Sequence, residues 1–357
     1  MGLITEEHIA ATSGGAAQLP RISVCIVASR PILLDRCLAS LQRQLDAPQF
    51  EVLVSFEHER QVASVTIGRF ADAQVSEVKD VLPAAARNVL VRRAGGELLL
   101  FLDDDAVVPP RFLRDIADLA DRFPNDDAFG GPNLTPPDSG FFQKVQGAVL
   151  GSRLVTGPVQ HRYASKVAGA ANQRHFMTCN LVIRRAAMRP FHGALVCAEE
   201  NGVLAEMSRA GRTMRYDPNL FVYHERRPGY PAFARQMLNY GRGRGHLFTH
   251  QPASLLPAAL VPAALFLYLA ALPGLLLLLD IDAWMLSLLG IYLALVAVTS
   301  WGIGWSLGRP AAALVSWPLI LTLHLGYGLG FWMGVVEGLG LAPRRSALLG
   351  GKRGETA

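Results

Sequence analysis

Residues 97–110 have the sequence ELLLFLDDDAVVPP, in which an apolar run of strand length ends on three consecutive aspartates. Such a run predicts a buried parallel strand that delivers its acidic side chains to the carboxyl edge of a sheet. Three adjacent carboxylates repel one another unless a divalent cation lies among them, and Mg²⁺ or Mn²⁺ suits such hard oxygen ligands. The alternative is an acidic loop in which Asp103 caps the following helix, because aspartate is also a favoured cap and turn residue.

Alternating strand and helix patterns lie around this stretch. Runs of β-branched and apolar residues at 21–28 and 50–56 predict buried strands, and apolar residues at helical spacing predict helices over 33–45 and 83–94. Strands and helices that alternate in this way form βαβ units, which build a mostly parallel sheet with helices on both faces. We therefore expect an α/β domain with a mostly parallel, mixed sheet over residues 21–250.

The secondary-structure signals continue after the aspartates but become less regular. Residues 111–123 predict a helix and residues 126–131 a short strand, while the pattern is weak over 140–173. Glycines and polar residues in the weak segment favour either a mobile region that lines a site or a segment with poorly defined secondary structure. Strand character returns at 175–183, and a helix is expected over about 202–210.

Three long runs in the last third of the chain contain no Asp, Glu, Lys or Arg: residues 251–279, 283–308 and 310–336. Each is longer than the roughly 20 residues that cross a hydrocarbon core, so we expect three transmembrane helices within residues 251–338. Residues 1–20, by contrast, are polar and rich in alanine and glycine. They lack the apolar core of a signal peptide and are expected to form a flexible segment.

Charge predicts the orientation of these helices only in part. Basic residues crowd the segment 209–244, which under the positive-inside rule places the N-terminal domain in the cytoplasm at the inner cell membrane. The loop from Asp280 to Asp282 then lies outside, and Arg309 returns inside. Three crossings would leave the basic tail, residues 339–357, outside. Either the tail breaks the rule, or one run is re-entrant or lies in the interface.

Composition also limits the partners of the chain. The net charge of +5 is modest and no basic face with interleaved aromatics is evident, so we expect no nucleic-acid partner. The basic residues before the apolar runs instead suit anionic lipid or phosphate groups. The four cysteines show no metal-binding spacing and are interpreted as core residues of a reduced compartment: Cys25, Cys37, Cys179 and Cys197.

Four short signals follow one another along about residues 20–250. They are the turn at Arg30 after the first strand, the tripeptide Ala86-Arg87-Asn88, the three aspartates, and Glu199-Glu200 at the start of a helix. Together with His224 and the basic segment after it, this order resembles a family-2 glycosyltransferase of the GT-A fold, similar to exopolysaccharide and galactofuranosyl transferases. The resemblance implies a nucleotide-sugar donor and a divalent metal, Mn²⁺ or Mg²⁺.

The resemblance also implies the metal ligands and the catalytic base. Asp105 and Asp103 match the positions that face the metal, and His224 matches a further ligand in several members. Glu200 matches the base that takes a proton from the acceptor hydroxyl, where the family usually has aspartate, and Glu199 is the reserve candidate. Without the resemblance, the glutamates would be interpreted as favouring the positive end of a helix, and His224 as a structural or surface residue.

Contacts to the donor and the acceptor are implied as well. Candidates for the nucleotide and its phosphates are Arg30, Glu57, Asp80, Arg87, Asn88, Asp103 and Asp104. Glu57 stands where the family usually ends its second strand on an aspartate pair, which leaves the nucleotide open, and Asp80 is a further candidate for this task. Residues next to the membrane are expected to bind a lipid diphosphate or anionic lipid headgroups: Arg235, Gln236, Arg242 and Arg244.

The resemblance and the apolar runs together predict a membrane-anchored, metal-dependent inverting transferase. It would move a sugar to a hydroxyl of a lipid-linked glycan or another membrane acceptor, for cell-surface polysaccharide or glycolipid synthesis. Transfer to a polyprenyl phosphate is the nearest alternative, and a non-catalytic membrane scaffold with a nucleotide-binding domain is an alternative of another class. A processive polysaccharide synthase is disfavoured because the chain lacks a Gln-x-x-Arg-Trp sequence.

Overall fold

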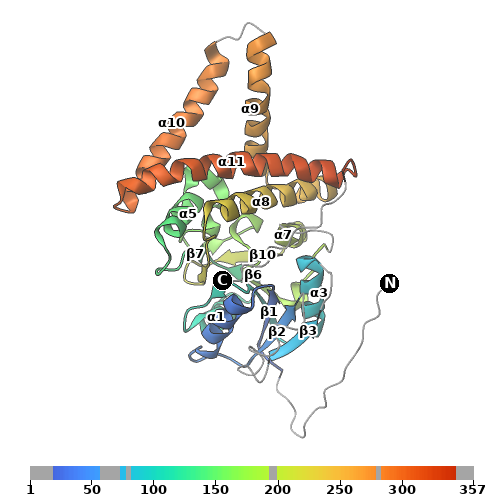
Figure 1. Cartoon of the computed structure of the whole chain (residues 1–357). Coiled ribbons are helices and arrows are strands. Elements are labelled where there is room, and N and C mark those ends of the chain that lie inside the picture. The colour runs from blue at the N-terminus through green and yellow to red at the C-terminus, as the bar shows by residue number, and fades with distance from the viewer. Residues whose placement is uncertain (1–18, 57–72, 78–81, 193–198, 279–282, 343–357) are drawn as a thin grey trace.

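The computed structural model describes residues 19–56, 73–77, 82–192, 199–278 and 283–342. An α/β domain forms the lower part of the molecule in Figure 1, and the long helices of the second half of the chain lie above it. An α/β domain followed by an α-helical region confirms the expected fold class.

The main sheet of the described residues has eight strands, in the spatial order β3-β2-β1-β4-β9-β6-β10-β8. Their bounds are β1 Ile22–Ala28, β2 Phe50–Phe56, β3 Ala73–Glu77, β4 Leu98–Asp103, β6 Asp126–Gly130, β8 Gly169–Ala170, β9 Asn180–Arg184 and β10 Thr213–Tyr216. The first four strands in this order are parallel, whereas β9 runs antiparallel to both of its neighbours, β4 and β6. The sheet is therefore mixed and mostly parallel, as expected.

Strand β4 is buried on both faces, which explains its unbroken apolar sequence. Leu98, Leu100 and Leu102 pack into one core with helices α1 (Pro31–Gln42) and α4 (Phe112–Arg122). Leu99 and Phe101 point to the other face. There they pack with helices α3 (Pro83–Arg93) and α7 (Glu199–Arg209), and the aspartates are left at the carboxyl edge between these layers.

A second, three-stranded sheet extends this edge. It consists of β5 (Ala106–Val107), β7 (Asn133–Leu134) and β11 (Val222–His224), and β11 pairs antiparallel with β5 and parallel with β7. The register places His224 opposite Ala106, one residue after the three aspartates. Residues far apart in the sequence thus meet at one place.

Two segments differ from the sequence-based expectation. Residues 140–173 are not poorly structured, because most of them form α5 (Phe141–Gly151), α6 (Arg153–Thr156), the 3₁₀ helix η1 (Gly157–Arg162) and β8. Helix α5 buries Val145 and Val149 in a cluster shared with α11. The strand expected at 175–183 begins only at Asn180, because residues before it form the 3₁₀ helix η2 (Gln173–His175).

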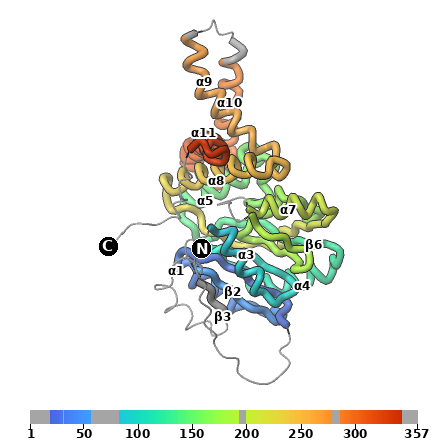
Figure 2. The backbone as a smooth tube through the Cα atoms, turned by 90° about the vertical axis from the view of Figure 1, so that its right-hand side faces the viewer, coloured from blue at the N-terminus to red at the C-terminus, as the bar shows by residue number. Residues whose placement is uncertain are grey.

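The long helices are α8 (Tyr230–His250), α9 (Leu260–Leu278), α10 (Ala283–Ser306) and α11 (Pro310–Gly338). Short 3₁₀ helices η3 (Arg185–Ala187), η4 (Pro252–Ser254) and η5 (Pro257–Ala259) complete the described elements. Within the part of the chain that the structure describes, three segments are long and apolar enough to cross a membrane: Pro257–Leu277, Leu286–Ser306 and Pro310–Gly338. Helix α11 lies along α8, whereas α9 and α10 project away from both (Figures 1 and 2).

Candidate active site

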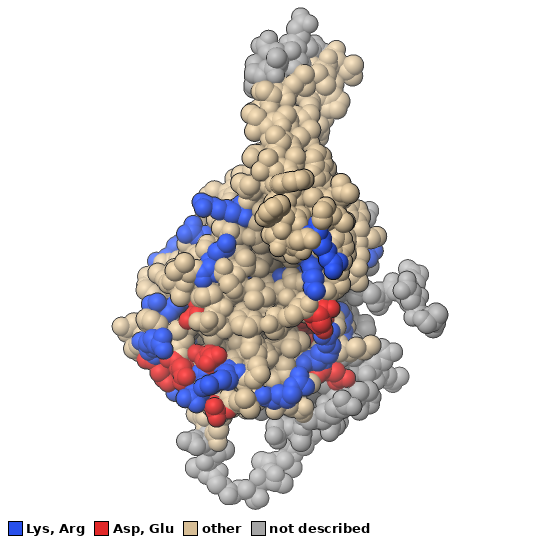
Figure 3. All heavy atoms as spheres, turned by 90° about the vertical axis from the view of Figure 1, so that its left-hand side faces the viewer, with Lys and Arg blue, Asp and Glu red and all other residues tan. Residues whose placement is uncertain are grey.

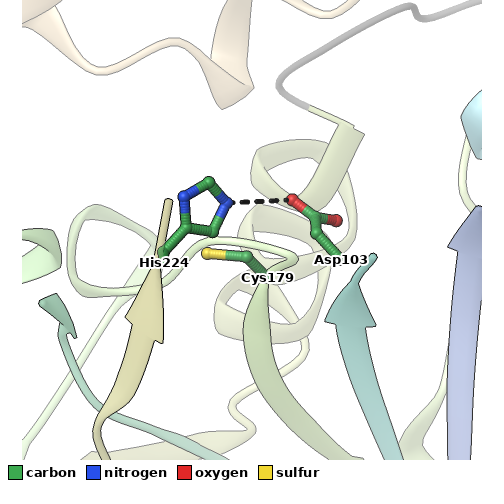
Figure 4. Close-up of side chains that lie close together, drawn as sticks. All are labelled: Asp103, Cys179 and His224. Carbon is green, nitrogen blue, oxygen red and sulfur yellow. Dashed lines mark ion pairs between the residues drawn. The ribbon is translucent and has the colours of Figure 1, made fainter. Parts of the chain in front are cut away.

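His224 reaches the aspartates from the neighbouring strand. Its Nε2 atom lies 3.1 Å from Oδ1 of Asp105 and 3.6 Å from Oδ2 of Asp103. Its Nδ1 atom lies 3.2 Å from the carbonyl oxygen of Glu225, which can only accept a hydrogen bond. Nδ1 therefore carries a proton, and Nε2 faces the two carboxylates, of which Figure 4 shows Asp103.

Asp105 is the most deeply buried of the carboxylates that face His224. Its side chain is 1% exposed. Among the described residues it faces two cationic or titratable groups, the His224 imidazole and the Arg30 guanidinium, whose Nη2 atom lies 2.8 Å from Oδ2. Two carboxylates beside an imidazole at a mostly buried strand end form a donor set that fits a divalent cation such as Mn²⁺.

Cys179, directly before β9, is a neighbour of this group that sequence reasoning missed. Its Sγ atom and the ligand atoms of Asp103 and His224 lie within 4.8 Å of one another. Burial raises the pKa of the Cys179 thiol well above its usual value. Mg²⁺ and Mn²⁺ prefer hard oxygen ligands to sulfur, so the two aspartates and His224 are the candidate donors.

The other two aspartates have different partners. Burial alone would raise the pKa of Asp103, but the His224 imidazole beside it and the charge of Arg87 lower it to about 2. Asp104 accepts hydrogen bonds from the backbone amides of Ser29 and Arg30, both at 2.8 Å, and does not line the cavity described below. Asp104 thus fixes the turn after β1.

Arg87 joins the aspartates to the first residue of α7. Its guanidinium forms a buried ion pair with Glu199, and its Nη2 atom lies 3.1 Å from Oδ1 of Asp103. Burial raises the pKa of Glu199 to about 7, although the charge of Arg87 opposes this shift. Because Arg87 contacts both Glu199 and Asp103, Glu199 lies on the same side of the site as the aspartates.

Glu200 points to a different set of cations. Its Oε1 atom lies 3.4 Å from Nη1 of Arg162 and 3.8 Å from Nη2 of Arg244, and it accepts a hydrogen bond of 3.0 Å from the Asn201 side chain. Arg162 is buried at the end of η1. Sequence reasoning missed Arg162, because no local motif marks it within residues 140–173.

One cavity of about 650 Å³ joins both sets of residues to the long helices. Its polar wall includes Arg30, Arg87, Asp103, Asp105, Arg162, Glu199, Glu200, His224 and Arg244. Its other wall comes from α9, α10 and α11 and includes Leu265, Val296 and Leu323. The cavity therefore runs from the carboxylates to the apolar helices.

The structure does not bring every predicted residue to this cavity. Asn88 exchanges two hydrogen bonds of 2.8 Å with the backbone of Phe191, and Gln236 donates to the Tyr240 hydroxyl at 3.0 Å. Arg242 pairs with Glu337 of α11, and Arg235 is exposed on α8. The remaining two donor candidates, Glu57 and Asp80, lie outside the described residues.

Comparison with known proteins agrees with the fold. Residues 24–190 match the sequence model of the family described as "Glycosyl transferase family 2". None of the curated proteins compared with the chain matches its sequence.

Two solved structures illustrate the likeness. The mannosyltransferase PcManGT from Pyrobaculum calidifontis, in complex with GDP-Man and Mn²⁺, is 16% identical, with a TM-score of 0.55 over 85% of this chain and 88% of its own. S. aureus TarS 1-349, in complex with UDP-GlcNAc, is 14% identical, with a TM-score of 0.45 over 88% of this chain and 92% of its own. The first of these likenesses shows a shared GT-A fold.

Proposed function

Because residues 24–190 of this chain form a glycosyl transferase family 2 domain, we propose that it moves a sugar from a nucleotide-sugar donor to a membrane acceptor with inversion. The observation that carries the proposal is the single cavity in which the carboxylates, Glu200 and the apolar helices meet. PcManGT, which shares the fold, is seen with GDP-Man and Mn²⁺. We assign the same classes of ligand, a nucleotide sugar and a divalent metal, to this site.

Asp103, Asp105 and His224 would hold the metal, because the His224 Nε2 atom faces both carboxylates. When bound, the metal supplies positive charge that stabilises the leaving nucleoside diphosphate. Arg87 and Arg30 line the same wall of the cavity and are proposed to orient the phosphates. Asp103 remains ionised at neutral pH, because its pKa is held at about 2, and it is therefore suited to a cation.

Glu200 is proposed as the general base for a hydroxyl acceptor. The hydroxyl oxygen attacks the anomeric carbon while the bond from that carbon to the diphosphate oxygen breaks, and the diphosphate leaves with the electron pair. The hydroxyl proton passes to the Glu200 carboxylate. A single in-line displacement of this kind inverts the anomeric centre and forms no covalent intermediate with the protein.

The acceptor is proposed to be lipid-linked, because the cavity continues between helices apolar enough to cross a membrane. A hydroxyl of a lipid-linked glycan is the leading candidate. One observation favours a second candidate, a lipid phosphate: Arg162 and Arg244 flank Glu200, and guanidinium groups bind phosphate well. The basic segment 209–244 supports a cytoplasmic position for the domain at the inner membrane.

The test is the release of nucleoside diphosphate from a panel of nucleotide sugars by the full chain in lipid nanodiscs with Mn²⁺. We expect turnover by the wild type, and chelation of the metal should abolish it. Asp105→Asn should lower turnover at least 100-fold, whereas the surface variant Asp118→Asn should turn over at the wild-type rate. Equal turnover by the wild type and Asp105→Asn would refute a metal-dependent transferase. Binding of a nucleotide sugar without any turnover would favour the scaffold alternative.

A further inference from the structure

Helix α11 is exposed along one side only. Its exposed positions include Leu314, Leu329 and Val336, whereas Leu319 and Phe331 are buried on its other side. The exposed residues recur at helical spacing and are apolar, as in a helix that lies in a membrane interface. In the most apolar stretch of α11, 44% of the residues are buried in the protein. The corresponding share is 11% in α9 and 17% in α10.

Backbone contact fixes α11 along α8. A Cβ atom at Gly241 of α8 would lie 1.9 Å from the carbonyl oxygen of Tyr327 on α11. A Cβ atom at Gly330 of α11 would lie 2.0 Å from the carbonyl oxygen of Leu238 on α8. A Cβ atom at Gly334 would lie 2.1 Å from the carbonyl oxygen of Arg242. The two helices are therefore in contact without intervening side chains, and α11 cannot enter the membrane unless α8 does so too.

Helix α8 has too many polar groups to cross a membrane. Arg235 and Asn239 are exposed on it. Arg242 and His246 face α11, where their Nε and Nε2 atoms lie 2.6 Å and 3.0 Å from Oε2 of Glu337. Ionisable residues in hydrocarbon are costly, so the pair of helices belongs at the membrane surface.

The other two apolar helices, α9 and α10, each contact α11 at one end. Near its start, α9 accepts a hydrogen bond of 3.0 Å at the Ala263 carbonyl from Trp332 of α11. At the end of α10, a Cβ atom on Gly304 would lie 3.0 Å from Ala313 of α11. Helices of 19 and 24 residues are about 29 and 36 Å long, which matches a hydrocarbon core of about 30 Å.

The surface of the molecule agrees with this division. Trp301 and Trp305 are exposed near the end of α10, close to the level of α11, where an aromatic belt is expected. In Figure 3, the projecting helices show no charged side chains, while Lys and Arg side chains lie on the body below them.

We infer that only α9 and α10 cross the membrane and that α11 lies in the interface beside α8, with its exposed apolar side on lipid. Two crossings return the chain to the side of the α/β domain. The basic residues that follow α11, namely Arg344, Arg345, Lys352 and Arg353, then obey the positive-inside rule. This arrangement does not depend on the proposed sugar transfer.

The test is labelling of single cysteines with a membrane-impermeant maleimide in sealed right-side-out and inside-out vesicles. The probes are Asn125→Cys on the α/β domain, Asp282→Cys between α9 and α10, and Lys352→Cys after α11. Cys197 is replaced by serine, and this parent chain without a probe is the background control, since Cys25, Cys37 and Cys179 are buried. Detergent-solubilised samples show that each probe can react.

We expect Asn125→Cys and Lys352→Cys to react in the same vesicle orientation and Asp282→Cys to react only in the opposite one. Reaction of Lys352→Cys only from the side of Asp282→Cys would demonstrate three crossings. Reaction of all three probes from one side would show that α9 and α10 do not cross. Either of these results would overturn the inference, and neither depends on enzymatic activity.

Discussion

The three consecutive aspartates have the same chemistry but three different environments. Asp104 is saturated by donors of the turn after β1, and Asp103 is shared between Arg87 and His224. Asp105 is buried and faces the Arg30 guanidinium and His224. Asp103 ends β4, and Asp104 and Asp105 lie in the turn before β5, so the chain turns between the three side chains and each carboxylate meets different partners.

Glu200 provides the sharpest distinction between the two acceptor classes. A hydroxyl acceptor must lose its proton, whereas a phosphate acceptor is already an anion. For a hydroxyl acceptor, Glu200→Gln should lower transfer at least 100-fold with little change in donor affinity. Transfer kinetics and donor titration with the purified chain measure both quantities.

The matched control is Glu206→Gln on the same helix, which lies outside the cavity and should keep near wild-type transfer. A loss of less than about threefold in Glu200→Gln would contradict its role as a base. That outcome would favour a phosphate acceptor bound by Arg162 and Arg244.

Glu199 should make stability depend on pH. Burial raises its pKa from 4.5 to about 7, so between these values the folded chain binds a proton that the unfolded chain has lost. This stabilisation is complete below pH 4.5 and disappears as the pH rises through 7. Glu199→Gln, which cannot titrate, should melt close to the wild type at pH 5 and roughly 5 °C higher than the wild type at pH 8.

Thermal unfolding in detergent at several pH values checks this expectation. Loss of the Arg87 ion pair could shift the melting temperature of the variant at every pH, so the pH-dependent part of the difference is the measured quantity. A difference between variant and wild type that stays constant from pH 5 to pH 8 would show that Glu199 is ionised throughout.

Residues at the ends of regular elements could be assigned from the sequence, and residues between them could not. Asp105 follows a strand, Glu199 begins a helix and His224 ends a strand. The packing of these elements brings the three residues to the same cavity. Arg162 ends a short 3₁₀ helix, and Cys179 precedes β9. Neither residue has a local pattern that distinguishes it from a structural residue, because their roles arise from tertiary contacts.

The same division holds for whole elements. Strands β1, β2 and β4 were predicted almost to the residue, because buried strands covered on both faces have continuous apolar sequences. Helix α5 was missed because its apolar residues pack against α11, about 170 positions later in the sequence. The antiparallel direction of β9 was also hidden, because apolar composition does not encode strand direction.

Helix α11 shows the limit of composition most clearly. Its length and apolarity match those of a spanning helix, and the sequence alone predicted a third crossing. Its glycines permit backbone contact with α8, and its Glu337 pairs with Arg242. Packing against a polar helix, which no hydropathy scale measures, distinguishes α11 from α9 and α10.

At the scale of the molecule, the cavity connects two chemically different regions. Its polar end lies at the carboxyl edge of the main sheet, and its apolar end lies among helices that suit lipid. A water-soluble donor and a membrane acceptor can thus approach the same centre from opposite directions. The in-plane pair α8 and α11 would hold this centre at a fixed height relative to the membrane surface.

The apolar end of the cavity should determine the use of long-chain acceptors. Leu265 of α9 lines the cavity, whereas Leu267 on the same helix is exposed and does not. Leu265→Trp should narrow the lipid end and lower transfer to a long-chain lipid acceptor about tenfold or more, because a larger side chain excludes the hydrocarbon chain. Hydrolysis of the donor, in which water is the acceptor, should stay unchanged, because the donor end of the cavity is untouched.

Leu267→Trp is the matched control and should leave both reactions near the wild-type rate. Equal transfer by the two variants to long-chain and to chain-free acceptors would show that the lipid chain binds elsewhere.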